Sequence, residues 1–484
     1  MGNSHSVDII PPRDGDSFFV EEQEEAFFTF LLAQEGILME EIMAMSNEPS
    51  VAPPAPGPPG KRFRNVYERP DYSQSVWWLM LEKGNCKVPG HREHTLFRRR
   101  FGVGFLRFKE FCESARGWDI TKETDAVGRL CVPLELKVLG ALRMVCKGCA
   151  FDAIAELSGM SEQTMHRFFH SFWAKFVIQF KDMWIKYPKT FAEASESMAM
   201  YAKLGYPGGA GSVDVTHVWW ANCPAGLASI YTGKEKIPTV AYEVTVDHTC
   251  RCMHVSEGHP GSRTDKTIVK TDEFLQAIRR KEILWDDVLF ELYRADGTKF
   301  LVRGAYLISD NGYAKWRMLQ APIKSSSSLD ELKWSTRLES VRKDVECFFG
   351  RLKIRFRILR SRILFHKQKC VDNVFVAACI MHNMLLHDDG LQAHWGEEQE
   401  EQSDDDDLRQ GIEMRRIRLR LVRTGEAGAV QSVPEVIRQI AMEGEVDNDI
   451  EDSHFTLRTQ LIAHYKYCKE HNLIHWMVRN GVET

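Results

Sequence analysis

The chain has 484 residues, enough for about three domains, and 44% of them are hydrophobic while 27% are charged. This composition is typical of a soluble globular protein. The sequence contains no uninterrupted run of about 18 apolar residues, so no membrane-spanning helix is predicted. The net charge of −5 does not by itself indicate a nucleic-acid partner, which must be sought in local charge. Twelve cysteines without a secretory signal fit a reducing compartment.

The first 60 residues are expected to lie outside the folded body. The hexamer Met1–Ser6 satisfies the pattern for myristoylation of Gly2, and a disordered terminus is the alternative. Residues 18–45 predict an acidic amphipathic helix, which either docks on a partner or packs on the body. Six prolines between residues 49 and 60 then predict an extended linker.

Two short basic clusters follow the linker, at residues 61–64 and 98–101. Lysine and arginine in such clusters suit contacts with phosphate or a nuclear-import signal. An ordinary solvated loop is the alternative.

Residues 133–176 have helical apolar spacing throughout, interrupted at Gly148 and Gly159, which predicts three helices in a helix-turn-helix. Ser161 is placed to cap the third helix. Its core face is predicted to be Met165, Phe168, Phe169, Phe172 and Phe176. The outward side chains, able to meet bases and phosphates of DNA, are then Gln163, His166, Arg167 and His170. A helical bundle without DNA function shows the same spacing and stays the alternative.

From residue 211 the residue pattern becomes typical of β-strands, which are predicted at 212–219, 239–246, 252–256 and 299–310. Asp296 and Gly297 form a turn signal before the last of these. Helical periodicity returns at 339–355 and 371–386, so this part is predicted to be an α/β domain. An acidic run at 397–407 then separates a C-terminal segment.

Three carboxylates in this domain are candidates for metal ligands. Asp214 lies within an apolar strand, where an acid is costly unless it meets a metal or another partner. Asp310 ends a predicted strand, which is where ligand sites of open α/β sheets lie. Glu346 borders the apolar face of the helix at 339–355. Each has a plainer interpretation, as a turn residue or a solvated helix position.

The segment around Glu346 is strongly basic, with ten lysines and arginines against two acids between residues 341 and 369. A basic helix beside acids that could bind metal ions is suited to binding a polyphosphate backbone. Arg351, Lys353 and Arg355 are therefore candidates for DNA contact. A solvated basic helix is the alternative.

Cysteine and histidine offer a competing zinc interpretation. Cys146 and Cys149 form a single C-x-x-C pair, for which a structural role is favoured. The alternating set His248, Cys250, Cys252 and His254 shares a zinc ion only if the chain turns at residues 247–249.

The residues around the three acids resemble those of the Harbinger/PIF transposases and their plant-transposon-like relatives. The matching motifs are Val213-Asp-Val-Thr-His217, Ser309-Asp-Asn-Gly-Tyr313, Arg342-Lys-Asp-Val-Glu-Cys-Phe-Phe-Gly-Arg-Leu-Lys353 and Ala377-Ala-Cys-Ile-Met-His-Asn-Met384. The segment His259-Pro-Gly-Ser-Arg-Thr-Asp265 is also similar, so the resemblance covers roughly residues 97–387. Val215, Asn311 and Cys347 depart from the residues usual in the family, and none of them is a predicted ligand.

The resemblance implies an α/β fold with an RNase H-like catalytic domain and a mixed sheet, preceded by an all-α helix-turn-helix region. It implies that Asp214, Asp310 and Glu346 are a DDE triad holding two divalent ions, Mg²⁺ or Mn²⁺, and that the protein is a nuclear DNA endonuclease and strand-transferase. The alternative is a domesticated, inactive DNA-binding scaffold. A Myb-like partner protein and a homo-oligomer are further expectations.

The predicted domains follow from this. They are a disordered arm and linker (1–60), a basic segment with the helix-turn-helix (61–205), the nuclease domain (206–390), an acidic linker (391–410) and a tail (411–484).

Overall fold

The computed structural model describes residues 71–125, 128–188, 191–281, 285, 288–390 and 452–474. These residues belong to one compact unit, Pro70–Thr484. The predictions for Gly2, for the arm and linker over 1–60 and for the acidic linker over 391–410 concern residues outside the described ranges.

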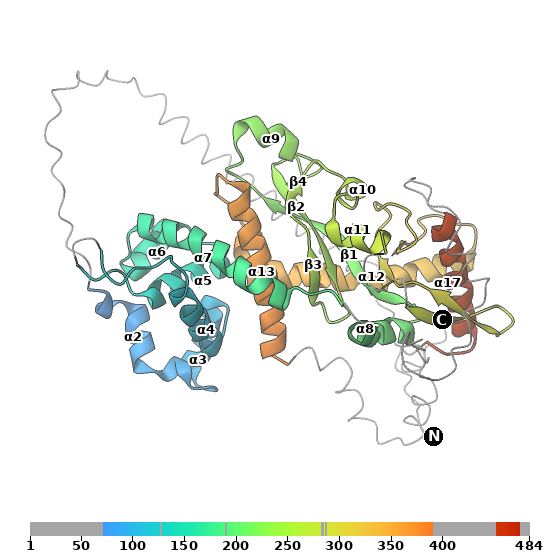
Figure 1. The fold of residues 1–484 in the computed structure, drawn as a ribbon, viewed down its shortest axis with the longest axis horizontal. Coiled ribbons are helices and arrows are strands. Elements are labelled where there is room, and N and C mark those ends of the chain that lie inside the picture. Colours follow the sequence, from blue (N-terminus) through green and yellow to red (C-terminus); the bar gives the residue numbers. More distant parts are fainter. Residues whose placement is uncertain are drawn as a thin grey trace, which may run out of the picture. The chain divides into compact units, whose positions relative to one another are not determined.

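The first part of the described chain is helical (Figure 1). Its elements are η1 (Tyr72–Gln74), α2 (Val76–Lys83), η2 (Asn85–Lys87), α3 (Arg92–Phe101), α4 (Phe105–Arg116), α5 (Leu134–Lys147), α6 (Phe151–Ser158) and α7 (Glu162–Trp184). Gly148 and Gly159 end α5 and α6 with φ angles of 68° and 71°, which a residue without Cβ adopts at little cost. The Ser161 hydroxyl accepts a hydrogen bond from the Thr164 N–H at 3.2 Å. Three helices therefore lie where the sequence predicts them.

Helix α7 buries the predicted aromatic face. Met165, Phe169, Phe172 and Phe176 are fully buried, and Phe168 nearly so. The helix is longer than predicted and packs along α13 (Gln368–Asp388), which belongs to the sheet domain. The helical region and the sheet domain consequently share one hydrophobic core, to which α5, α7, β2 and α13 all contribute.

A mixed sheet forms the second part, with the order β3-β2-β1-β7-β8 and β4 paired to β2. The strands are β1 (Gly209–Trp219), β2 (Thr239–Val246), β3 (Cys252–Val255), β4 (His259–Pro260), β7 (Tyr306–Ile308) and β8 (Leu319–Gln320). β2 runs antiparallel to β1 and β3, whereas β7 runs parallel to β1 and β8. The predicted α/β domain with a mixed sheet is confirmed.

The predicted strand at 299–310 is wrong as a single element. It divides into β6 (Lys299–Arg303), which pairs with β5 (Leu289–Tyr293) in a separate hairpin, and β7 in the main sheet. The break occurs at Gly304, whose φ of 88° is not an extended conformation. The turn signal at Asp296 and Gly297 does connect the two hairpin strands, and Asp296 Oδ1 accepts from the Thr298 N–H at 2.9 Å.

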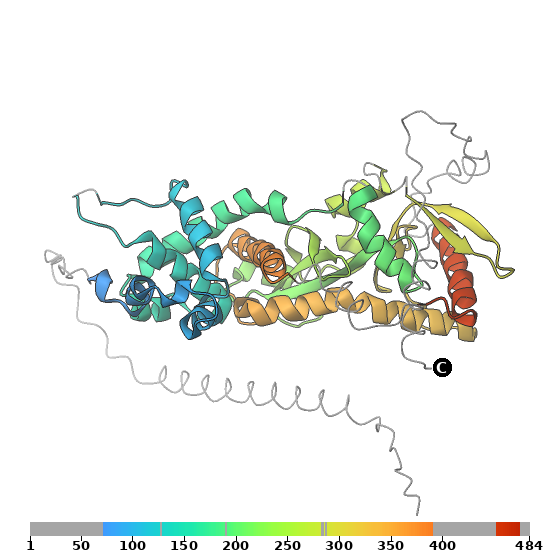
Figure 2. The same ribbon diagram turned by 90° about the horizontal axis from the view of Figure 1, so that it is seen from below.

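Helices cover the sheet and the hairpin. They are α8 (Phe191–Lys203), α9 (Ala225–Tyr231), α10 (Asp265–Ile268), α11 (Glu273–Arg279), α12 (Leu329–Arg355), η4 (Arg357–Leu359), α13 and α17 (Asp452–Glu470). The long helix α12 runs along the sheet in Figure 2, and it contacts β1, β2, η4 and α17. Its first half shares a core with the hairpin and α17, whereas Val345 and Leu352 in its second half join the core of the helical region.

One described helix, α13, is long and apolar enough to cross a membrane by length and composition. However, 78% of its apolar window is buried, and Phe375 stacks on Tyr242 of β2 with 3.9 Å between ring centroids. A core helix passes the same test, and the packing of α13 is that of a core helix.

Candidate functional site

Asp214 and Asp310 lie on neighbouring parallel strands. Ser212 of β1 is paired with Ile308 of β7, so continuing the register by two residues brings Asp214 level with Asp310. Side chains two residues apart point to the same face of a sheet, and neighbouring strands are about 4.8 Å apart. The predicted pair of acids is therefore brought together by the sheet itself.

The loop after β7 holds the carboxylate of Asp310. The Gly312 N–H donates a hydrogen bond to Asp310 Oδ1 at 2.8 Å. A Cβ added to Gly312 would lie 3.0 Å from that oxygen and 2.8 Å from Asp265 Oδ2. Gly312 thus lies between two carboxylates, and a larger residue would push against both.

Asp265 belongs to this group, although it was not predicted from the sequence as a site residue. It is the first residue of the short helix α10. Burial raises its pKa, and the negative charge of Asp310 raises it further. The only sequence signal for it was its place at the end of the segment 259–265.

Neighbouring negative charges raise the affinity of Asp214 for a proton. The pKa of Asp214 is raised from 3.8 to about 6, chiefly by burial, with the charges of Asp310 and Asp265 adding to the increase. A hydrogen bond from the Val215 N–H and the positive charge of Arg342 act in the opposite direction. Such a concentration of negative charge is stabilised by a cation.

Arg342 of α12 supplies one cation. Its Nη1 donates to Asp214 Oδ2 at 2.8 Å, and its Nη2 donates to Glu346 Oε1 at 2.6 Å. Arg342 is 7% exposed, whereas the side chain of Glu346 is 48% exposed. The third predicted acid therefore joins the first through a shared guanidinium.

The role of Arg342 corrects the interpretation of the basic segment. The sequence counted this residue among the positive charges available for DNA, but its guanidinium is buried and pairs with the carboxylates of Asp214, Glu346 and, at 3.6 Å, Glu339. Lys353 is likewise half-buried, and its ammonium donates to the His217 carbonyl at 3.1 Å. Arg355 is half-buried with Nη1 3.4 Å from His382 Nδ1, whereas Arg351 is exposed.

The donor chemistry of the acids suits Mg²⁺ or Mn²⁺, because hard divalent cations prefer carboxylate oxygens. Within the described ranges, however, no group of three or more His, Cys, Asp or Glu side chains is placed to hold a metal ion. That finding also leaves the zinc interpretation without support. Cys146 donates instead to the Phe101 carbonyl at 3.1 Å, and His254 Nε2 pairs with Asp272 at 2.8 Å.

The candidate DNA-reading side chains of α7 are distributed as follows. Gln163, His166 and Arg167 are exposed. His170, predicted to face outward, is partly buried because its ring packs on Phe365 with 4.8 Å between centroids. Burial lowers the pKa of His170 from 6.5 to about 4.

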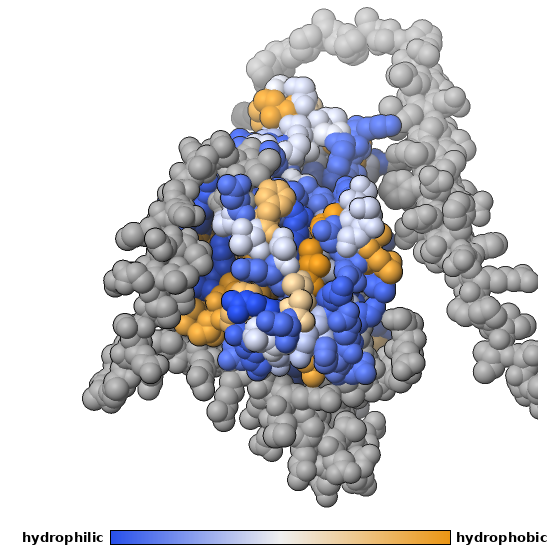
Figure 3. Space-filling view, turned by 90° about the vertical axis from the view of Figure 1, so that its right-hand side faces the viewer, coloured by the Kyte–Doolittle hydropathy of each residue, from blue (hydrophilic) through white to orange (hydrophobic). Residues whose placement is uncertain are grey.

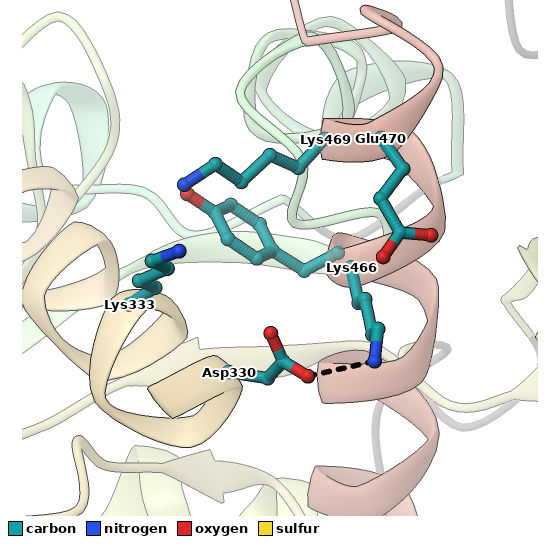
Figure 4. A pocket seen from close by; sticks show the side chains of 6 residues that line it. Asp330, Lys333, Lys466, Lys469 and Glu470 are labelled. Carbon is teal, nitrogen blue, oxygen red and sulfur yellow. Dashed lines mark ion pairs between the residues drawn. The ribbon is translucent and has the colours of Figure 1, made fainter. Parts of the chain in front are cut away.

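A separate hollow lies between the start of α12 and α17 (Figure 4). It is lined by Asp330, Lys333, Tyr465, Lys466, Lys469 and Glu470, and Lys466 pairs with Asp330 at 2.8 Å. The surrounding face is mainly hydrophilic, with scattered apolar patches (Figure 3). None of the predicted site residues lines this hollow.

Residues 185–393 match a protein family described as Plant transposon protein. A curated protein from Arabidopsis thaliana, Protein ALP1-like, is 23% identical over 307 residues, which cover 61% of this chain and 72% of that protein. No solved structure shows a significant match. The matches confirm the resemblance seen in the motifs, since the chain is similar to Harbinger-type, transposase-like proteins.

Proposed function

We propose that this protein is a divalent-metal-dependent DNA endonuclease and strand-transferase of the DDE transposase type. The observation that carries the proposal is the parallel register of β1 and β7, which sets Asp214 level with Asp310 at one face of the sheet. Glu346 on α12 is connected to the same place through Arg342. Asp214, Asp310 and Glu346 are then the catalytic residues.

The strand arrangement supports an RNase H-like catalytic domain. An antiparallel series β1, β2, β3 is followed by β7 and β8, which lie on the other side of β1 and run parallel to it. This order agrees with the fold that the family resemblance implies. Asp214 then lies on the central strand β1, and Asp310 lies just after the neighbouring strand β7. Both strands are paired with another strand on each side.

Asp214, Asp310 and Glu346 would hold two divalent cations, Mg²⁺ or Mn²⁺, with Asp265 as an additional carboxylate beside Asp310. Such cations, when bound, supply positive charge for the attacking hydroxyl and the leaving oxygen of an in-line displacement at phosphorus. The chain itself contributes the placement of the oxygens. The Gly312 N–H orients Asp310, and Arg342 orients Asp214 and Glu346.

DNA would be bound by α7 and by the exposed part of the basic segment. Gln163, His166 and Arg167 are candidates for the recognition helix, and Arg351 for the phosphate backbone. Lys353 and Arg355 would act mainly within the fold, because both are half-buried. Nuclear localisation, a Myb-like partner and a homo-oligomer complete this proposal.

The test is strand cleavage of duplex DNA in Mg²⁺ or Mn²⁺. Asp214→Asn, Asp310→Asn and Glu346→Gln should each abolish cleavage, because the amide keeps the size of the side chain but removes the charge that a hard cation needs. Asp330→Asn is a matched control, since this partly exposed acid of α12 pairs with Lys466, outside the site. Full activity of Asp310→Asn would overturn the assignment.

A domesticated, non-cutting scaffold is the second candidate. It is favoured by the ion pairs that Arg342 makes with Asp214 and Glu346, which give both acids a positive counter-charge without a metal. Wild-type protein that binds duplex DNA but leaves it uncut in Mg²⁺ and Mn²⁺ would decide for the scaffold. Terminal inverted repeats flanking the gene would favour the transposase.

A further inference from the structure

The helical region meets the sheet domain where the end of α5 contacts η4, just after α12. A Cβ added to Gly148, the residue that ends α5, would lie 3.4 Å from the backbone carbonyl of Arg357 and 2.8 Å from Ser361 Oγ. The end of α3 joins the same place, because Arg143 Nη1 donates to the Arg100 carbonyl at 3.4 Å. Backbone packing therefore fixes three elements close together.

Four positive charges converge at this contact, and we call them the junction cluster: Arg99, Arg143, Lys147 and Arg357. The pKa of Lys147 is lowered by burial and by the charges of Arg143, Arg357 and Arg99. Among the described residues, no acidic side chain forms an ion pair with any member of the cluster. The fold thus holds like charges together at an electrostatic cost.

A role in helix capping accounts for only part of the cluster. Arg99 lies in the last turn of α3 and Lys147 in the last turn of α5, where positive charge complements the helix dipole. Arg143 lies a turn before the end of α5, and Arg357 belongs to another element. Helix capping does not explain why the positive charges of Arg143 and Arg357 lie close to that of Lys147 with no acidic side chain between them.

Two of the four side chains of the cluster are accessible to an extended polyanion. Arg99 and Arg357 are exposed, and Arg143 and Lys147 are half-buried. Phe365, which follows η4 along the same loop, packs on His170 of α7. One loop thus connects the junction cluster with the candidate recognition helix.

We propose that the junction cluster binds the phosphate backbone of double-stranded DNA where the helical region meets the sheet domain. This inference rests on the proposed function and adds a second, sequence-independent contact to the recognition helix. The positive charge on both sides of the junction places one DNA backbone across the two parts of the protein. Binding of this kind releases counterions and weakens steeply with salt.

The test measures binding of full-length protein to a fluorescently labelled duplex by anisotropy, in EDTA and at several salt concentrations. The double variant Arg99→Gln with Arg357→Gln removes two exposed charges. If both contact phosphate, the slope of log affinity against log salt should become shallower by about 1.8, irrespective of duplex sequence. The control double variant Lys109→Gln with Lys466→Gln removes the same net charge from residues paired with Glu113 and Asp330.

The proposal would be overturned if both double variants changed the slope of log affinity against log salt equally. It would also be overturned if Arg99→Gln with Arg357→Gln left that slope unchanged. If wild type cuts DNA in Mg²⁺ while the cluster variant binds normally, only this inference fails. If wild type binds DNA through the cluster but never cuts, only the nuclease function fails. Wild type that binds no duplex overturns both.

A second measurement leaves the sequence of the protein unchanged. Lys147 can be acetylated with an N-hydroxysuccinimide ester in the presence or absence of duplex DNA and quantified by mass spectrometry. DNA bound at the junction should protect Lys147 several-fold more than Lys109. Equal modification of Lys147 with and without saturating DNA would contradict the proposal.

Discussion

The guanidinium of Arg342 donates a hydrogen bond to the carboxylate of Asp214, with 2.8 Å between Nη1 and Oδ2. This bond joins α12 to the central strand β1. Because Arg342 is buried, removing its charge leaves Asp214 without its counter-charge in a site where water screens poorly.

Arg342→Met should lower the free energy of unfolding by about 3 kcal/mol at pH 7 in EDTA, because one partner of a buried ion pair is lost. Urea unfolding measures the change. Lys343→Met, at the next and exposed position of α12, should stay within about 0.5 kcal/mol of wild type. Equal stability of the two variants would show that the ion pair contributes nothing.

Asp344 should make the protein less stable as pH rises. Its pKa is raised from 3.8 to about 7, mainly by burial, while the Tyr201 hydroxyl donates to it at 3.0 Å. Between these two values the folded protein keeps a proton that the unfolded chain has released, so the free energy of unfolding falls with increasing pH. Asp344→Asn keeps an acceptor for Tyr201 and removes this charge.

At pH 8, Asp344→Asn should therefore be more stable than wild type by about 2–4 kcal/mol, and at pH 4 the difference should nearly vanish. Urea unfolding of both proteins at the two pH values gives the comparison. A difference that does not change with pH would refute the buried, proton-binding state of Asp344.

Two glycines should respond oppositely to alanine. A Cβ on Gly211 of β1 would lie 2.5 Å from the Val246 carbonyl oxygen, so Gly211→Ala should destabilise the protein by about 1–3 kcal/mol. At Gly350 of α12 nothing lies within 4 Å, so Gly350→Ala should stabilise it by about 0.5–1 kcal/mol. Thermal unfolding distinguishes the signs, and the same sign for both would contradict the close packing at Gly211.

Arg167 is the clearest probe of α7 as a recognition helix. It is exposed, on the side opposite the buried phenylalanines. Arg167→Ala should weaken specific binding by about 1–3 kcal/mol if the side chain contacts a base, or make the salt dependence slightly shallower if it contacts a phosphate. The measurement is the affinity of the folded Arg167→Ala variant for its cognate duplex. An unchanged affinity would mean that α7 has only a structural role.

Helix α17 should contribute to stability through its apolar face. Leu461 is fully buried against the hairpin and α12, so Leu461→Ala should cost about 2–5 kcal/mol. Phe455 is larger but 43% exposed, and Phe455→Ala should cost less than about 1 kcal/mol. Similar losses in urea unfolding would mean that α17 is not packed as described.

The sequence was sufficient for features set by local periodicity. The predicted limits of β2 agree with the structure, and the aromatic face of α7 is buried where the spacing placed it. The sheet then brought Asp214 and Asp310 together, a relationship that depends on strand pairing and that only the family motifs indicated in advance.

Features that depend on side-chain direction or on distant partners were not predictable. Gly304 gave no sign that one apolar stretch would divide between two sheets. Arg342 was counted with other basic residues because sequence shows the sign of a charge but not whether its side chain turns inward. His170 was placed outside because Phe365, which covers it, lies far along the chain.

The packing of α17 also bears on how the protein is made. Leu457, Leu461 and Tyr465 help to complete a core that also contains residues from α8, the hairpin, β7 and the first half of α12. A growing chain on the ribosome lacks these side chains until α17 has been synthesised, well after the hairpin, and domains fold as units only when their parts are available. The helical region, whose core extends along the chain only to α13, can therefore reach its final packing before the hairpin, whose apolar side chains are covered once α17 has been made.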